Sequence, residues 1–189
     1  MSTLMPVCQT VTVVAFRGER TRPFAQSFSN ALQAGKNGVG LGPSFVDCLL
    51  FAGHAGLSLD GTKTIYGFNP DGGGLPAWQI MDRLLNGDRF PGIVADDTNV
   101  FNAARKRGIP EFSLEVILPD PELQKLKTAL DDERKKSKYW YGFPNGDGDC
   151  NCITWVERLG LPLLTGRMDE FAKVEAIRAY RSPRFGQCV

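Results

Sequence analysis

Histidine is almost absent from this 189-residue chain, in which His54 is the only one. Without a second imidazole the chain is a poor candidate for a zinc site. A regular cysteine pattern is also lacking, since the five cysteines are irregularly spaced and odd in number, which does not suit a disulfide framework. With 42% hydrophobic residues a chain of this length can bury a core without metals or disulfides. We therefore expect one domain over residues 1–189, with reduced cysteines.

The chain has no excess of charge and no long apolar run. Its 22 basic and 21 acidic residues leave a formal charge of +1, which gives no electrostatic basis for binding nucleic acid or an anionic membrane. No stretch approaches the roughly 20 apolar residues of a spanning helix. The first sixteen residues, MSTLMPVCQTVTVVAF, lack the pattern of a secretory signal. We expect a soluble protein without a nucleic-acid partner or an integral membrane segment, either cytoplasmic or exported by a route without a classical signal.

Hydrophobic patterns and turn residues predict a single α+β domain built on an antiparallel sheet with packed helices. The segment 139–149, aromatic and then rich in glycine and aspartate, is expected to be an irregular loop. The predicted strands cover residues 10–16, 45–51, 54–59, 63–68 and 112–118, and the predicted helices cover residues 24–34, 76–85, 98–107, 120–138, 152–159 and 169–180.

The main functional candidate is a thiol and imidazole pair. Asn151 is a good N-cap, which would place Cys152 in the first turn of a helix, where the helix dipole favours a thiolate. Free backbone N–H groups at that helix start could also stabilise an oxyanion. His54, on a predicted strand, would take the thiol proton and return it to a leaving group. The two residues are predicted to act as nucleophile and general base.

Each of these residues also has an ordinary structural interpretation. Free cysteine is among the most buried residue types, and a lone histidine on an apolar strand is usually structural. Cys150 is a rival nucleophile or a disulfide partner for Cys152. The helix register favours Cys152, because Cys150 lies outside the predicted helix.

The two segments together resemble a known family. A His-x-Gly-hydrophobic strand, here His54-Ala55-Gly56-Leu57, precedes an Asn-Cys pair at a helix start, here Asn151-Cys152-Ile153-Thr154-Trp155. This order resembles the circularly permuted papain-like thiol hydrolases, which include the lecithin retinol acyltransferase-like and NlpC-like proteins. The resemblance covers about residues 54–68 and 139–159. It implies a permuted papain-like fold, with Cys152 as nucleophile, His54 as base and no cofactor or metal.

The third catalytic residue is not determined by the resemblance. The family more often has a histidine or an amide there, and this chain has no second histidine. If the hairpin loop is residues 60–62, Tyr66 faces the same side as His54 and lies nearest. Asn69, just past the strand, is the alternative.

Other patterns are weaker. Oxygen-bearing side chains at alternate positions from Asn145 to Asn151 suggest an EF-hand loop, but the required glycine and glutamate are missing. The pair Asp96-Asp97 precedes a helix, which favours capping over acid–base chemistry.

The resulting hypothesis is a cysteine-dependent amidase or peptidase that attacks a peptide, isopeptide or related amide carbonyl, with a protein or peptide substrate. A bacterial effector or toxin role would suit such a protein by family association. The alternatives are a lipid acyltransferase or thioesterase of the same fold, and a non-catalytic protein-binding module that presents aromatic residues. Oligomeric state and substrate identity do not follow from the sequence.

Overall fold

The fold is organised around a mainly antiparallel sheet. The computed structural model describes residues 8–19, 21–142 and 149–159 of the chain. The seven strands follow the order β5-β1-β2-β3-β4-β6-β7, and only the β6–β7 pair is parallel. The strands are β1 (Cys8–Arg17), β2 (Gly53–Ser58), β3 (Tyr66–Pro70), β4 (Phe90–Asp96), β5 (Glu111–Pro119), β6 (Trp140–Tyr141) and β7 (Asp149–Cys150). The helices are α1 (Arg22–Lys36), α2 (Phe45–Ala52), α3 (Ala77–Leu85), α4 (Thr98–Lys106), α5 (Asp120–Lys135) and α6 (Cys152–Arg158). The predicted α+β class with an antiparallel sheet is confirmed.

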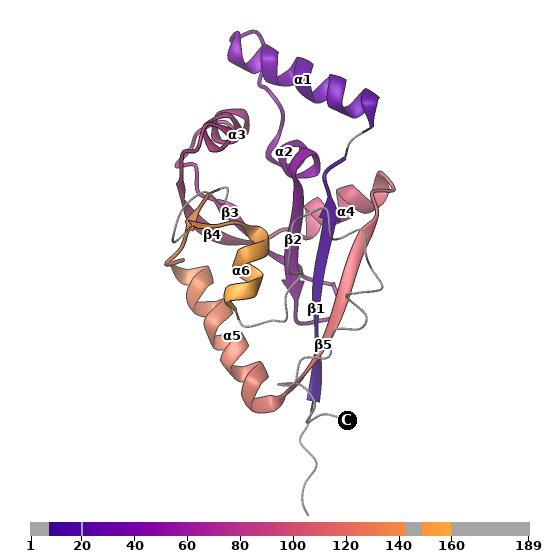
Figure 1. Ribbon diagram of the computed structural model, residues 1–189, viewed down its shortest axis with the longest axis vertical. Helices are drawn as coiled ribbons and strands as arrows, with labels where there is room; N and C mark the ends of the chain where they lie inside the picture. Colours follow the sequence, from indigo (N-terminus) through magenta and orange to yellow (C-terminus); the bar gives the residue numbers. More distant parts are fainter. Residues whose placement is uncertain (1–7, 20, 143–148, 160–189) are drawn as a thin grey trace, which may run out of the picture.

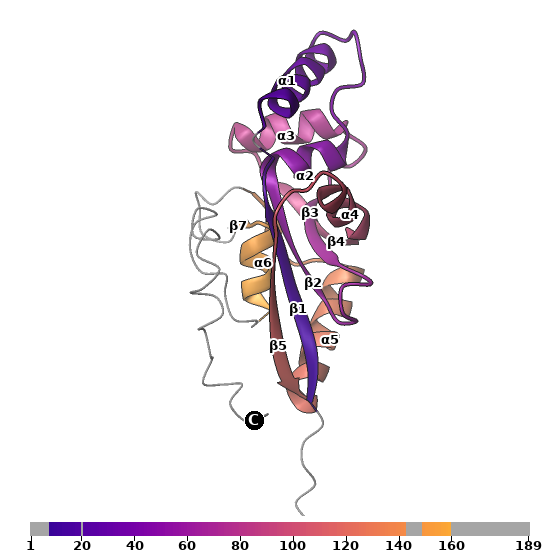
Figure 2. The same cartoon turned by 90° about the vertical axis from the view of Figure 1, so that its right-hand side faces the viewer.

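The sheet separates two hydrophobic clusters because side chains alternate along its strands. Val13, Leu57 and Phe68 belong to the cluster that also contains the apolar residues of α5 and α6. Phe16 and residues of α2 and α4 form the second cluster. Figure 2 shows α6 and α4 on opposite sides of the sheet, and Figure 1 shows α1 at one end of the molecule, beyond α2.

The strand predicted for residues 45–51 is wrong, because this segment forms α2. Ser44 and Asp47 make a reciprocal capping box, in which the Ser44 side chain accepts from the Asp47 N–H and the Asp47 carboxylate accepts from the Ser44 N–H. This cap satisfies two backbone donors at the helix start and overrides the strand-like apolar pattern that follows. Consequently His54 lies at the second residue of β2, directly after a helix.

The β2–β3 hairpin differs from the expected register. Gly56 pairs with Gly67 and Leu57 pairs with Tyr66, with a loop over residues 59–65 that is longer than the expected three residues. Directly opposed residues share a face, so Tyr66 lies on the side of Leu57 and away from His54. The prediction that Tyr66 faces His54 is therefore wrong, and the same register puts Asn69 on the His54 side.

Several other expectations can be compared with the structure. The strand over residues 112–118 and the helix over residues 98–107 are confirmed, as β5 and α4. The strand β4 was not predicted, because Pro91 and Gly92 interrupt its pattern. The expected irregular loop over residues 139–149 contains the two short strands β6 and β7, and residues 143–148 lie outside the described part. The predicted helix over residues 169–180 also lies outside it.

Two further findings concern cysteine and membranes. Cys8 is disulfide-bonded, so the expectation that all five cysteines are reduced is wrong for this residue. Cys48, Cys150 and Cys152 are free thiols. Within the described residues, no helix has the length and apolar character needed to cross a membrane.

Candidate active site

The imidazole of His54 is completely buried against the strand β1 and the helix α4. Its ring packs against Phe16 of β1, with ring centroids 6.4 Å apart, and against Phe101 of α4 at 5.8 Å. The preceding Gly53 has a φ of 89° and ends α2, so this positive φ redirects the chain from helix to strand. These contacts hold the only imidazole of the chain in one orientation.

Asp97 is the direct partner of this imidazole. Its Oδ2 lies 2.7 Å from Nε2 of His54, and both side chains are almost fully buried. A carboxylate in this position accepts the Nε2 proton, which leaves Nδ1 as the nitrogen available to another group. Within the described structure Nδ1 is buried without a hydrogen bond of ordinary geometry.

Asp96 and Asp97 have different roles, although the sequence pattern predicted capping for both: Asp96 caps a helix, and Asp97 binds His54. Asp96 caps α4, because its Oδ1 accepts from the N–H of Thr98 at 3.0 Å and from the Thr98 hydroxyl. Asp97 occupies the N-cap position, but its side chain makes no capping bond. The assignment of Asp97 to capping is wrong. Because Asp96 alone supplies the cap, the presence of a second carboxylate beside it is the sequence signal that could have indicated another role for Asp97.

Asn69 joins the same group, whereas Tyr66 does not. Asn69 is buried, and its Nδ2 donates to Oδ2 of Asp97 at 2.8 Å, so one carboxylate oxygen receives both Asn69 and His54. Tyr66 instead lies under the guanidinium of Arg134, 4.8 Å from its ring centroid, and packs against the α5–α6 cluster. Of the two predicted candidates for the third residue, only Asn69 is brought near His54, and it contacts Asp97.

Gly67 makes the His54–Asp97 contact possible. A Cβ built at Gly67 would lie 2.5 Å from Nε2 of His54 and even closer to Oδ2 of Asp97. Gly56, the glycine of the His-x-Gly strand, would similarly place a Cβ 2.7 Å from the carbonyl oxygen of Tyr66. Gly56 and Gly67 pair directly across β2 and β3. Both strands therefore lack a side chain at the position where His54 meets Asp97. Sequence reasoning did not identify Gly67.

At the other end of the site, Asn151 caps α6 as predicted. Its Oδ1 accepts from the N–H groups of Ile153 and Thr154, both at 2.9 Å, and the Thr154 hydroxyl accepts from the N–H of Asn151 at 2.8 Å. Cys152 is the first residue of α6. The cap engages two of the first three helical N–H groups, so the expectation that these donors are available to an oxyanion applies only to the N–H of Cys152.

Electrostatics link the two ends of the site. Burial lowers the pKa of His54, but neighbouring Cys152 and the Asp97 carboxylate raise it and outweigh burial, bringing the pKa to about 10. Among the effects that raise this pKa, the charge of Cys152 is the largest, and a hydrogen bond to Cys152 adds to it. The helix α6 packs against β2, and His54 of β2 is bonded to Asp97 at the start of α4, so Cys152, His54 and Asp97 come from three elements that meet at this site.

Tyr141 lies against the same thiol and was missed as a site residue by sequence reasoning. Burial raises the pKa of its hydroxyl well above the ordinary value, as do Cys152, Asp97 and a hydrogen bond to Cys152. The hydroxyl therefore remains protonated, and thus able to donate, throughout the neutral pH range. Tyr141 is placed by β6, where it pairs with Phe90 of β4.

Cys150, the rival nucleophile, has different surroundings. It is fully buried in β7, and the Thr154 hydroxyl donates to its Sγ at 3.6 Å. Burial raises the pKa of Cys150, and His54 is influenced by Cys152 rather than by Cys150. Cys48 is also buried, and burial next to Asp47 raises its pKa to about 12. Of the three free thiols, Cys152 is the one coupled to the imidazole.

Comparisons with known proteins give no family for this chain: no family model, no curated protein and no solved structure matches it. Within the described residues, no group of three or more histidine, cysteine, aspartate and glutamate side chains could hold a metal ion.

Proposed function

We propose that this chain is a cysteine-dependent hydrolase of the amidase or peptidase type, with a permuted papain-like arrangement. Cys152 is the nucleophile, His54 the acid–base residue and Asp97 the residue that orients the imidazole. The observation that carries the proposal is the bond between His54 Nε2 and Asp97 Oδ2, which leaves Nδ1 of a buried imidazole for the neighbouring Cys152. A thiol, an imidazole and a carboxylate in this order form a catalytic triad.

In this reaction a protonated His54 next to Cys152 stabilises the thiolate, since a cation favours the charged form of sulfur. The thiolate attacks the carbonyl carbon of an amide, and the new C–S bond gives a tetrahedral oxyanion. When the C–N bond breaks, Nδ1 of His54 donates its proton to the departing amine, which leaves a thioester. Water then attacks the thioester, His54 accepts the proton of the water, and the C–S bond breaks to release the acid.

Tyr141 and the N–H of Cys152 are the donors proposed for the oxyanion. The Tyr141 hydroxyl lies at the thiol and stays protonated, and a donor at the developing charge stabilises the transition state more than the ground state. Asn69 is a positioning residue in this scheme, because it acts on Asp97 rather than on the reacting atoms. An amine in place of water would give acyl transfer from the same intermediate, which is the second enzymatic possibility.

The proposal is tested by comparing the alkylation rates of the thiols with iodoacetamide at pH 7, mapped by mass spectrometry. We expect Cys152 to react at least about tenfold faster than Cys150 and Cys48, and His54→Ala to remove most of that difference. Cys48 is the internal control, since its raised pKa keeps it a thiol. Equal and slow labelling of all three would contradict the proposal and favour a non-catalytic binding module.

A further inference from the structure

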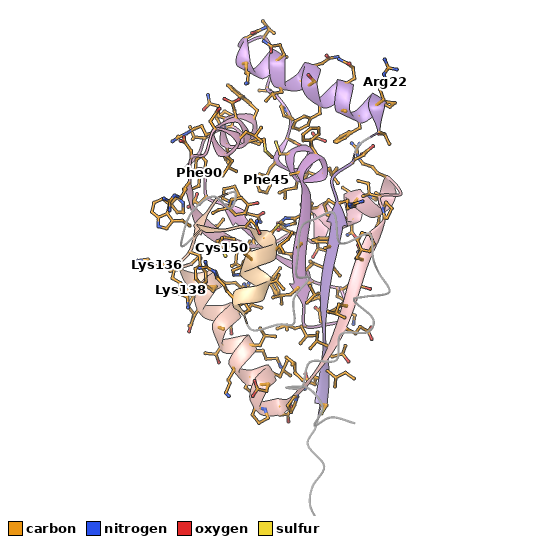
Figure 3. The ribbon with its side chains drawn as sticks, viewed as in Figure 1. Arg22, Phe45, Phe90, Lys136, Lys138 and Cys150 are labelled. Atoms are coloured by element: carbon orange, nitrogen blue, oxygen red, sulfur yellow. The ribbon has the colours of Figure 1, made fainter. Side chains whose placement is uncertain are left out.

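A second feature of the molecule lies between α5 and the end of α6. A cavity of about 660 Å³ opens there, which is within the size range of ligand sites. Figure 3 shows two of its lining residues, Lys136 and Lys138, at the C-terminal end of α5. Its lining includes Lys125, Lys136, Lys138, Tyr139, Arg158 and Leu159.

The charges of this cavity favour an anionic ligand. Four cationic side chains line it, against the two carboxylates Asp132 and Glu133. Asp132 already contacts Lys135 at 3.9 Å, and the buried Glu133 accepts a hydrogen bond from Ser137 at 2.7 Å. In the described part of the chain, Lys136 has no carboxylate within 4.0 Å and is exposed to solvent. Lys138 lies 4.0 Å from Glu133 and Lys125 lies 3.6 Å from Glu122, so Lys136 supplies the positive charge of the cavity that no carboxylate of the described residues balances.

The wall of the cavity is also held in place. Lys138 Nζ and the Arg158 guanidinium lie 5.1 Å and 4.8 Å from the centroid of the Tyr139 ring, as cation–π contacts do. The backbone N–H of Tyr139 donates to the Ser137 hydroxyl, which in turn donates to Glu133. This chain of contacts orders the cationic side before any ligand arrives.

We infer that this cavity binds an acidic side chain of the polypeptide substrate, and this inference rests on the proposed function. Tyr139 lies two residues before Tyr141, and Arg158 lies six residues after Cys152 on α6. A helix rises about 1.5 Å per residue, so the cationic wall begins roughly 9 Å from the nucleophile. An extended peptide advances about 3.3 Å per residue, and the acidic side chain therefore lies about three residues from the scissile bond.

A peptide fits the cavity better than a nucleic acid does. The two carboxylates in the wall would repel a continuous polyanion, whereas they tolerate a single acidic side chain bound at Lys136 and Lys138. Ala129 and Leu159 also offer apolar surface to neighbouring side chains of a peptide. An oligonucleotide is therefore an alternative outcome of the test.

Binding is measured first, with the full chain carrying Cys152→Ala to prevent turnover. Fluorescein-labelled nonapeptides that differ only in having three Glu, three Gln or three Lys residues are titrated by fluorescence anisotropy at 50 mM and 300 mM salt. We expect the Glu peptide to bind about fivefold more tightly than the Gln peptide at low salt, with the difference shrinking at high salt. Lys136→Glu should reverse the preference toward the Lys peptide.

The matched control is Lys106→Glu, which makes the same charge change on the exposed end of α4, away from the cavity. It should leave the order of the three peptides unchanged. Equal affinity for all three peptides, or the same loss with Lys106→Glu as with Lys136→Glu, would overturn the inference. Tighter binding of a single-stranded oligothymidine that is lost in Lys136→Glu would also overturn it, in favour of nucleic acid.

A second measurement separates this inference from the proposed function. Peptidyl chloromethyl ketones with one Glu placed one to six residues from the electrophile are reacted with the unmodified chain. We expect the labelling rate of Cys152 to be highest with Glu about three residues away, and Lys136→Glu to abolish that maximum. If Cys152 reacts at one rate whatever the Glu position, the inference fails and the proposed function stands. If no probe labels Cys152 but the Glu preference in binding persists, the proposed function fails and the inference is restricted to an acidic peptide site.

Discussion

Replacing Gly67 by alanine is the most direct test of the site geometry. The added Cβ would lie 2.5 Å from Nε2 of His54 and nearer to Asp97, whereas carbon and nitrogen atoms in ordinary contact are about 3.4 Å or more apart. The two side chains must therefore separate, and their 2.7 Å hydrogen bond cannot persist. Gly67 is not conformationally required, because its φ lies outside the left-handed region.

The expected energies follow from the two effects of this methyl group. Loss of a hydrogen bond to a charged group costs about 1.5–3 kcal/mol, and overpacking costs about 1–3 kcal/mol. We expect Gly67→Ala to lower the free energy of unfolding by about 2.5–6 kcal/mol in urea titrations, which a domain with a stability of about 10 kcal/mol survives folded. The alkylation rate of Cys152 should fall by at least about tenfold, because the imidazole is no longer held at the thiol.

Two further variants show whether the effect passes through the His54–Asp97 pair. Gly40→Ala adds the same methyl group on the surface, 3.3 Å from the Cβ of Ala34, and should change stability by less than about 0.5 kcal/mol. In an Asp97→Asn background, Gly67→Ala should cost clearly less than in the unmodified chain. Normal stability and normal Cys152 alkylation in Gly67→Ala would refute the described geometry.

The remaining predictions concern protonation and the oxyanion. His54 is the only histidine, so its imidazole proton resonances can be followed by NMR without assignment. These resonances should not titrate between pH 6 and 8. Asp97→Asn or Cys152→Ala should lower the pKa of His54 from about 10. A transition near pH 6.5 in the unmodified chain would contradict the proposed pair. Because folding raises the pKa of His54, its protonation stabilises the fold fully below about pH 6.5. The free energy of unfolding should therefore fall as the pH rises from about 6.5 to about 10. A flat profile in urea titrations would contradict this. Tyr141→Phe should lower turnover of an amide substrate by about tenfold to a hundredfold and lower iodoacetamide alkylation of Cys152 much less, because alkylation forms no oxyanion. Equal losses in both assays would show that Tyr141 acts on the thiol alone.

The local parts of the site were predictable from sequence because each depends on neighbours in the chain. An asparagine side chain reaches N–H groups two and three residues ahead, so Asn151 as N-cap and Cys152 as first helical residue follow from their order. The motif around His54 predicted a strand for the same reason. The helix at residues 45–52 was also encoded locally, by Ser44 and Asp47, but the apolar run that follows them led to the wrong prediction.

Residues that meet across the sheet could not be chosen in this way. Tyr66 and Asn69 exchange their predicted positions relative to His54 with a single-residue change in hairpin register. The turn pair Asp60-Gly61 indicates a shorter loop than the one the structure contains over residues 59–65. Asp97 is 43 residues from His54 in sequence, and Asp96 next to it offers the same carboxylate. Only the position of α4 against β2 and β3 decides which of the two points at the imidazole.

The single imidazole, the capped cysteine, and the strand and helix that carry them are thus encoded locally in the chain. Capping, periodicity and turn preferences act over a few residues and can be recognised in one dimension. Tertiary structure decided that these groups meet, that Asp97 rather than Tyr66 contacts His54, and that Gly67 leaves the space for it. Those outcomes depend on strand register and helix packing, in which contacts between residues far apart in the chain outweigh local preference.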